Sequence, residues 1–238
     1  MEREIAILMA AGLGSRMLPL TEKIPKPLIA VNGKPLIETM IEALFKRKVS
    51  HIYIVVGYKK EVFQYLLESY RDITLVENKD YLIKNNISSI QAVCNILGKE
   101  NCFICECDIY VHNPDVFLPE LHNSCYFGKM IHGYSDDWIF ETNNNQITKI
   151  QKGGTDVYNM TGIAYFKKND LKILKMRVQQ IYNNPESMNL FWDEVVDQLL
   201  SEIYMDIHEV KSDDLVEIDT IEELVELDNS YQNWLKGK

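Results

Sequence analysis

Apolar residues in the first half of the chain follow two alternating patterns. Short continuous apolar runs that end in a small residue, a glycine or an acid are typical of buried parallel strands. Such runs occur at residues 4–10, 51–57, 74–77 and 101–108. Segments with apolar residues at helical spacing separate them and predict helices at residues 35–47, 59–70 and 88–97. This alternation predicts an open, mainly parallel sheet with helices on both faces.

The pattern changes after residue 125, where short strand-like runs are separated by turn residues. These runs lie at residues 126–134, 138–142, 146–150 and 161–166. They predict an antiparallel excursion over about residues 126–168. Further helices are predicted at residues 169–182, 191–202 and 221–235, with a strand at 216–218.

The predicted fold class is therefore α/β, a Rossmann-like three-layer α/β/α arrangement with a mixed, mainly parallel sheet and a small antiparallel excursion. We expect a single domain over residues 1–238. Its core is predicted in residues 1–125, and residues 169–238 are expected to add the last helices and the final strand.

Charge narrows the range of partners. The chain has 25 Lys and Arg against 35 Asp and Glu, a formal net charge of −10. A surface this negative repels nucleic acids and anionic membranes, so neither is expected as a partner. Between residues 16 and 34 the balance reverses, because Arg16, Lys23, Lys26 and Lys34 stand against Glu22 alone. An anionic small molecule is expected to bind there.

Targeting signals and disulfides are not expected. No stretch reaches the roughly 18 apolar residues that a membrane span needs. The first residues, MERE, do not resemble a signal peptide. The five cysteines form an odd set without the spacing of a disulfide framework. We therefore expect a cytoplasmic protein with reduced thiols.

The most specific motif follows the first predicted strand, where residues 8–16 read LMAAGLGSR and residues 25–28 read PKPL. Because Gly12 and Gly14 carry no Cβ, backbone N–H groups of this turn can approach a triphosphate closely. Arg16 can grip phosphate oxygens, and Lys26 can place a compact charge on the α-phosphate. A tight structural turn is the alternative for G-x-G alone. Met17 stands where a dinucleotide fingerprint needs glycine, and no G-K-[ST] of a P-loop is present.

With these motifs, residues 10–28 resemble the signature of the sugar-nucleotidyltransferase superfamily. Within this superfamily, residues 4 to about 225 resemble the LicC-type CTP:phosphocholine cytidylyltransferases and their close relatives, the 2-aminoethylphosphonate cytidylyltransferases. The resemblance implies CTP as the nucleotide and Lys26 and Arg16 as the catalytic residues. The implied nucleotide-binding residues are Leu8, Ala10, Ala11, Gly12, Gly14, Ser15, Arg16, Lys26, Asn86, Ser88, Ser89 and Asp108.

Two acids are candidates for a metal site. Asp108 ends the predicted strand at residues 101–108, and Asp219 follows the predicted strand at residues 216–218. Mg²⁺ prefers one or two carboxylates together with phosphate oxygens, which fits a pair of acids beside a triphosphate loop. Taken singly, each acid is more typical of a loop or a helix cap than of a metal ligand. The resemblance implies that Asp108 and Asp219 together hold Mg²⁺ as the cofactor.

The second half offers residues for an acceptor molecule, namely Trp138, Phe191, Trp192, Asp193 and Glu217. Aromatic faces attract quaternary ammonium groups, and carboxylates favour a primary ammonium. Phosphocholine and 2-aminoethylphosphonate therefore both remain open as acceptors, the latter implying a role in phosphonate biosynthesis. Trp192 is explained equally well as a core residue.

The expected reaction is Mg²⁺-dependent transfer of CMP from CTP to a small cationic phosphorylated or phosphonate acceptor, with release of pyrophosphate. An ionised acceptor oxygen attacks the α-phosphorus directly, so no general base is assigned. A sugar-1-phosphate nucleotidylyltransferase, a non-catalytic nucleotide-binding relative and an NAD-dependent oxidoreductase are the alternatives. A homodimer and a domain fused after the C-terminus remain open.

Overall fold

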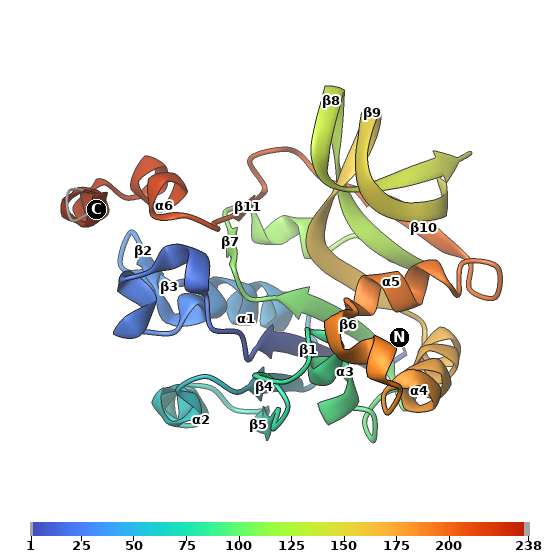
Figure 1. Ribbon diagram of the computed structural model, residues 1–238, viewed down its shortest axis with the longest axis horizontal. Coiled ribbons are helices and arrows are strands. Elements are labelled where there is room, and N and C mark those ends of the chain that lie inside the picture. The colour runs from blue at the N-terminus through green and yellow to red at the C-terminus, as the bar shows by residue number, and fades with distance from the viewer. Residues whose placement is uncertain (1, 236–238) are drawn as a thin grey trace.

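A seven-stranded sheet forms the centre of the protein, whose computed structural model describes residues 2–235 (Figure 1). Its strand order is β10-β8-β9-β6-β1-β4-β5. The bounds are β1 Glu4–Ala10, β4 Ile52–Val56, β5 Ile73–Glu77, β6 Asn101–Glu106, β8 Ser124–Asn143, β9 Gln146–Phe166 and β10 Met205–Glu209. Strands β6, β1, β4 and β5 run parallel, whereas β9 runs antiparallel to both β6 and β8. The prediction of a mixed, mainly parallel sheet is confirmed.

Helices cover both faces of this sheet (Figure 1). On one face lie α1 (Leu36–Lys46) and α2 (Tyr65–Ser69). On the other lie α3 (Ile87–Ala92), α4 (Lys168–Ile181) and α5 (Trp192–Asp197). Side chains of β1 alternate between the two cores, because neighbouring residues of a strand point to opposite faces. The three-layer arrangement is thereby confirmed.

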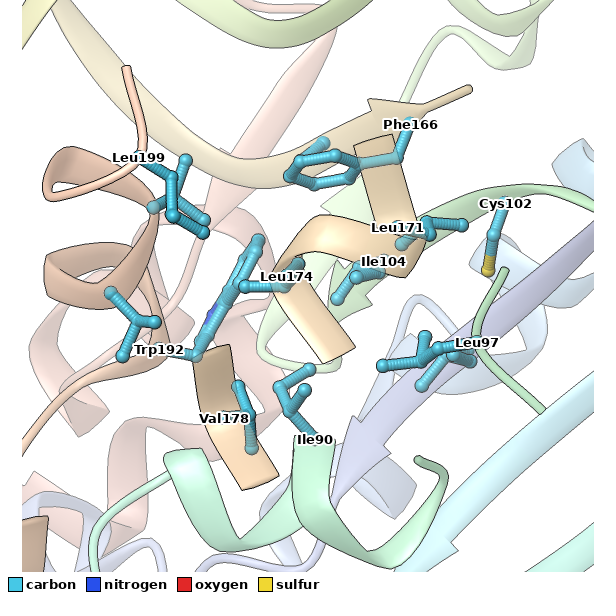
Figure 2. Close-up of a cluster of buried hydrophobic side chains, with 14 of the residues drawn as sticks. Ile90, Leu97, Cys102, Ile104, Phe166, Leu171, Leu174, Val178, Trp192 and Leu199 are labelled. Atoms are coloured by element: carbon cyan, nitrogen blue, oxygen red, sulfur yellow. The ribbon is translucent and has the colours of Figure 1, made fainter. Parts of the chain in front are cut away.

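The core on the second face is continuous from strand to helix (Figure 2). Leu171, Leu174 and Val178 recur on one side of α4 and pack with Ile90 of α3. Trp192 of α5 lies in the same cluster. Burying side chains of this size stabilises the fold by roughly 1.5–3 kcal/mol each. This packing holds α3 and α5 in place on the sheet. The first residues of both helices lie beside the site described below.

The predicted antiparallel excursion has a different internal structure from the one expected. Its four short runs belong to two long strands, β8 and β9, which pair across a turn at residues 144–145. Several register shifts let these strands bend and continue through positions read as turns, including Gly153 and Gly154. The separate strands expected at residues 138–142 and 146–150 are therefore parts of one bent hairpin.

Smaller elements complete the structure. Two short pairs, β2 with β3 and β7 with β11, were not predicted as pairs, and β10 was not predicted at all. Their bounds are β2 Ala30–Val31, β3 Lys34–Pro35, β7 Ile109–Val111 and β11 Leu215–Glu217. Within residues 2–235, no helix is long and apolar enough to cross a membrane.

The single helix predicted at residues 221–235 is interrupted. The structure has α6 (Ile221–Leu227) and α7 (Gln232–Leu235), with Asp228 extended between them. The Asp228 carboxylate accepts hydrogen bonds from the backbone N–H groups of Asn32, at 2.8 Å, and Ser230, at 3.0 Å. This contact with a distant loop explains why the helical pattern breaks there.

Candidate active site

The glycine-rich turn follows β1 at the carboxyl edge of the sheet, where ligands of open α/β sheets bind. Gly14 has a positive φ of 64°, and a Cβ added to it would lie 3.1 Å from the Cβ of Lys26. Glycine at this position therefore lets the turn pack directly against the lysine.

Beside this turn lies a cavity of about 340 Å³. It is lined by Met9, Ala10, Ala11, Gly12, Gly14, Ser15, Arg16, Lys26, Pro27, Asn78, Tyr81, Lys84, Asn85, Asn86, Ser89, Glu106, Cys107, Asp108, Phe191 and Asp219. Ten of the predicted nucleotide-binding residues are in this lining, whereas Leu8 and Ser88 are not. Leu8 is fully buried in the core beneath the turn. Ser88 is also buried, where its hydroxyl donates to the Asn85 carbonyl oxygen at 2.8 Å.

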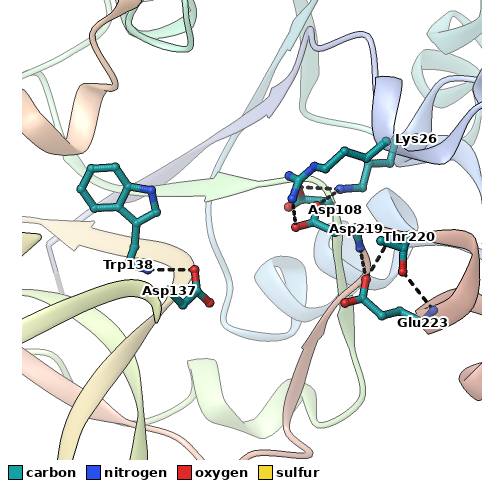
Figure 3. Close-up of polar contacts among 8 residues, drawn as sticks. Lys26, Asp108, Asp137, Trp138, Asp219, Thr220 and Glu223 are labelled. Carbon is teal, nitrogen blue, oxygen red and sulfur yellow. Dashed lines mark hydrogen bonds and ion pairs between the residues drawn. The ribbon is translucent and has the colours of Figure 1, made fainter. Parts of the chain in front are cut away.

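Lys26 is held at the centre of a charged cluster (Figure 3). Its ammonium donates to Oδ2 of Asp108 at 2.9 Å and to Oδ1 of Asp219 at 2.7 Å. The guanidinium of Arg16 also pairs with Asp219. Only 8% of Lys26 is exposed, and this burial pulls its pKa down. The charges of Asp108 and Asp219 outweigh burial and raise the pKa of Lys26, so it stays cationic.

Three carboxylates converge beside this lysine. Oxygens of Asp108, Glu217 and Asp219 lie within 4.8 Å of one another. Oδ1 of Asp108 is buried and has no hydrogen-bond partner among the described residues. Burial, followed by the charges of Asp108 and Asp219, raises the pKa of Glu217 to about 8. Converging hard oxygens with one unpartnered buried atom are a donor set suited to a divalent cation such as Mg²⁺.

Glu106 is a site residue that the sequence analysis missed. Its carboxylate accepts a hydrogen bond from Nδ2 of Asn86 at 3.2 Å, and it lines the cavity with Asp108. Burial raises its pKa well above the usual range, and the charges of Asp108 and Asp193 add to that shift. Its signal in the sequence was its position two residues before Asp108, because alternate residues of a strand share a face.

The cavity wall beyond β5 was also missed. Asn78 is buried and donates through Nδ2 to the hydroxyls of Ser88, at 2.8 Å, and Ser89, at 3.2 Å. These contacts fix the first turn of α3 against the sheet. Tyr81, Lys84 and Asn85 line the same wall. Asn85 belongs to the paired-Asn segment that also carries the predicted residues Asn86, Ser88 and Ser89, whereas no motif pointed to Tyr81 and Lys84.

Two of the expected acceptor residues come together. The rings of Trp138 on β8 and Phe191 before α5 make an edge-to-face contact with centroids 5.7 Å apart. Phe191 also lines the cavity. Figure 3 shows Trp138 and its neighbour Asp137 across from Lys26, Asp108 and Asp219. An acceptor bound between these two groups would meet both a ring face and carboxylates.

Trp192 and Asp193 are placed differently from the acceptor role expected for them. Trp192 is 1% exposed, and its ring stacks on that of Tyr126 at 5.8 Å, which makes it a core residue. Asp193 is buried and accepts a hydrogen bond from the Tyr126 hydroxyl at 2.8 Å. Burial raises the pKa of Asp193 to about 7. Neither residue lines the cavity, because α5 turns both toward the core.

Comparison with known proteins agrees with this geometry. Residues 6–125 match the MobA-like NTP transferase domain. The chain is 45% identical to a 2-aminoethylphosphonate cytidylyltransferase of Lancefieldella rimae, over 99% of this chain and 96% of that protein. It is 30% identical to a choline-phosphate cytidylyltransferase of Streptococcus pneumoniae, over 96% of this chain and 98% of that protein.

Solved structures give the same result. The structure of CTP:phosphocholine cytidylyltransferase from Streptococcus pneumoniae superposes with a TM-score of 0.86 at 30% identity, covering 96% of this chain and 99% of that one. An inositol-1-phosphate CTP transferase from T. maritima, at 18% identity and a TM-score of 0.73, shares the fold. The chain belongs to the MobA-like NTP transferase family and, within it, to the cytidylyltransferases.

Proposed function

We propose that the protein transfers CMP from CTP to 2-aminoethylphosphonate in a Mg²⁺-dependent reaction that releases pyrophosphate. The observation that carries this proposal is the meeting of Lys26 with Asp108, Glu217 and Asp219 beside the glycine-rich turn. A cation and a set of hard oxygen ligands at one end of a cavity are what a nucleoside triphosphate requires. The 45% identical relative supports the choice of acceptor.

In this proposal the triphosphate of CTP, the nucleotide donor, lies along the glycine-rich turn. Backbone N–H groups of the turn and the guanidinium of Arg16 bind the β- and γ-phosphates. Asn86 and Ser89, at the start of α3, face the nucleoside end of the cavity. Lys26 is buried and already cationic, so its charge is in place where negative charge develops on the α-phosphate.

Asp108, Glu217 and Asp219 would hold the metal ion. Mg²⁺ bound there supplies positive charge to the triphosphate oxygens during transfer. The acceptor's phosphonate is ionised near neutral pH and attacks the α-phosphorus directly, so the chain needs no general base. The chain's contribution is alignment of the two substrates and neutralisation of charge by Lys26 and Arg16.

The accessible groups near Trp138 favour a primary ammonium on the acceptor. Because Trp192 is buried, only the rings of Trp138 and Phe191 remain of the expected aromatic set. Asp137 adjoins Trp138, and the carboxylates of Asp108 and Asp219 lie across from it (Figure 3). A primary ammonium can donate three hydrogen bonds to such carboxylates, whereas a trimethylated one can donate none.

Phosphocholine is the second candidate acceptor. The edge-to-face pair of Trp138 and Phe191 is the observation that favours it, because a ring face attracts a quaternary ammonium by about 1–2 kcal/mol. The two acceptors differ both in the methylation of nitrogen and in the phosphorus linkage. A primary ammonium is bound mainly by hydrogen bonds to carboxylates, whereas a trimethylated one is bound mainly by ring faces.

The experiment that tests the proposal measures pyrophosphate release from CTP, UTP, ATP and GTP in separate reactions. Each nucleotide is combined with 2-aminoethylphosphonate, phosphocholine, phosphoethanolamine or glucose 1-phosphate. We expect the highest kcat/KM for CTP with 2-aminoethylphosphonate, and no release when EDTA replaces Mg²⁺. A preference for phosphocholine would transfer the assignment to the second candidate. Activity only with the hexose phosphate would refute both.

A further inference from the structure

Lys129 of β8 and Asn159 of β9 are paired across the two strands, and neither has a role in the proposed function as described above. Residues paired in antiparallel strands project from the same face of the sheet, so their side chains are neighbours. Lys129 is partly buried, yet within residues 2–235 it makes no ion pair or side-chain hydrogen bond. A partly buried ammonium without a close partner is costly unless a ligand supplies one.

The charges that act on Lys129 include one from the acid cluster. Burial lowers the pKa of Lys129, and the charges of Glu217, Asp213, Asp137 and Asp214 oppose that shift. The strongest of these charges is that of Glu217, which belongs to the acid cluster. Asp137 precedes Trp138 and also acts on Glu217. Lys129 is therefore close enough to Glu217 and Asp137 to be influenced by the charges of both.

Asn159 provides a second unpartnered group at this position. Its Oδ1 atom is buried and has no hydrogen-bond partner among the described residues. A buried acceptor without a donor has lost its hydrogen bonds to water and gained none in return, so such atoms are uncommon. Asn159 also pairs with Ile139, the residue after Trp138. This pairing sets Asn159 opposite the strand position that follows Trp138.

An anionic acceptor needs a cation of its own near Glu217. Lys26 and Arg16 are paired with Asp108 and Asp219, and in the proposed function they bind the phosphates of CTP. The other lysines near the site have partners in the protein. Lys84 donates to the Ser187 hydroxyl at 2.8 Å, and the Lys152 ammonium lies 5.5 Å from the centroid of the Trp138 ring. Lys129 is the cation on β8 that is available to a phosphonate.

We propose that Lys129 and Asn159 form the anchoring site of the acceptor. The ammonium of Lys129 binds the phosphonate oxygens, and Oδ1 of Asn159 accepts an N–H from the aminoethyl group. This inference rests on the proposed function for the identity of the acceptor. It assigns Lys129 to the affinity and orientation of the acceptor, with no part in binding CTP.

The test compares the full-length enzyme with Lys129→Met, Lys129→Arg and Asn159→Leu. Lys149→Met is the matched control, since Lys149 also lies on the β8–β9 hairpin but pairs with Asp197. One measurement is the KM for 2-aminoethylphosphonate and for CTP. The other is a ³¹P NMR titration with ethylphosphonate, which has the phosphonate but no amine.

We expect Lys129→Met to raise the acceptor KM and the ethylphosphonate Kd by roughly tenfold or more, with the CTP KM unchanged. Lys129→Arg should recover most of this loss. Asn159→Leu should raise the KM for the aminated acceptor while sparing ethylphosphonate. The control should match the wild type in both measurements.

An unchanged acceptor KM and ethylphosphonate Kd in Lys129→Met would overturn the anchoring site. An equal rise in the KM for CTP would also overturn it, because Lys129 would then act on the whole site. If the wild type transfers CMP to none of the acceptors, the proposed function fails. The ethylphosphonate titration still decides on Lys129 in that case, since it requires no turnover.

Discussion

The ammonium of Lys26 lies 2.7 Å from Oδ1 of Asp219, although 193 residues separate them in the chain. The lysine is positioned by the turn between β1 and β2, and the acid by the segment after β11. Since β11 pairs with β7, which continues from β6, Asp219 is brought back to the strand end that carries Asp108. The pairing of these short strands therefore assembles the site.

Replacing Lys26 should remove most of the turnover. Lys26→Met keeps much of the buried stem but removes the charge from the α-phosphate, and we expect kcat to fall by about 100- to 1,000-fold. The measurement is the rate of pyrophosphate release at saturating substrates. Lys23→Met is the control, because Lys23 is exposed and contacts the Trp234 ring. A rate within threefold of the wild type would exclude Lys26 from catalysis.

The acid cluster should control the response to metal. We expect Asp108→Asn to raise the Mg²⁺ concentration for half-maximal rate on the order of tenfold or more, because a neutral amide is a weaker ligand for a hard cation. A Mg²⁺ titration of the rate measures this. Glu120→Gln serves as control, since Glu120 is exposed and outside the cluster. Identical titrations for Asp108→Asn and the wild type would contradict a shared metal site.

The site residues that could be predicted from the sequence are those whose positions depend on local structure. Gly14 and Lys26 belong to a short motif, and Asp108 follows a strand whose end is recognisable from its apolar run. Such positions are set by local structure and by the common edge of parallel strands. Glu106 was within reach of the same argument, because it is the last residue of β6, two positions before Asp108, and lines the same cavity.

Other features depended on contacts that no local pattern contains. Phe191 and Trp192 are adjacent aromatics, yet one lines the cavity and the other is buried, because the packing of α5 decides their directions. The helix predicted at residues 221–235 ends at Asp228 because of a contact with Asn32. Strand β10 has only two apolar residues among its five, Met205 and Ile207, and depends on pairing with β8, so its pattern was not recognised as a strand.

Phe191 and Trp192 should therefore separate function from stability. We expect Trp192→Ala to lower the free energy of unfolding by about 3–5 kcal/mol, because it leaves a large cavity in the core. Phe191→Ala should cost less stability and raise the KM for the acceptor severalfold, because its ring contacts Trp138 at the cavity. Urea unfolding and initial rates measure the two effects. Equal stability losses, with the acceptor KM unaffected in Phe191→Ala, would contradict this division.

Asp193 should make stability depend on pH in an unusual direction. Its pKa is raised from 3.8 to about 7 in the folded protein, chiefly by burial. Between these values the folded state holds a proton that the unfolded state has lost, so stability falls as pH rises from about 4 to about 7. Glu217 has a raised pKa as well, so the wild-type curve alone does not isolate Asp193.

The difference between the wild type and Asp193→Asn isolates this group. The substituted amide is neutral at every pH and can still accept the hydrogen bond from Tyr126, which contacts Oδ1 at 2.8 Å. We expect the two proteins to be similarly stable near pH 4 and the variant to gain on the order of a few kcal/mol relative to the wild type by pH 8. Urea unfolding at several pH values between these limits measures the divergence. Parallel curves would mean that Asp193 is ionised throughout, and its carboxylate would then require a cationic partner instead of the Tyr126 hydroxyl alone.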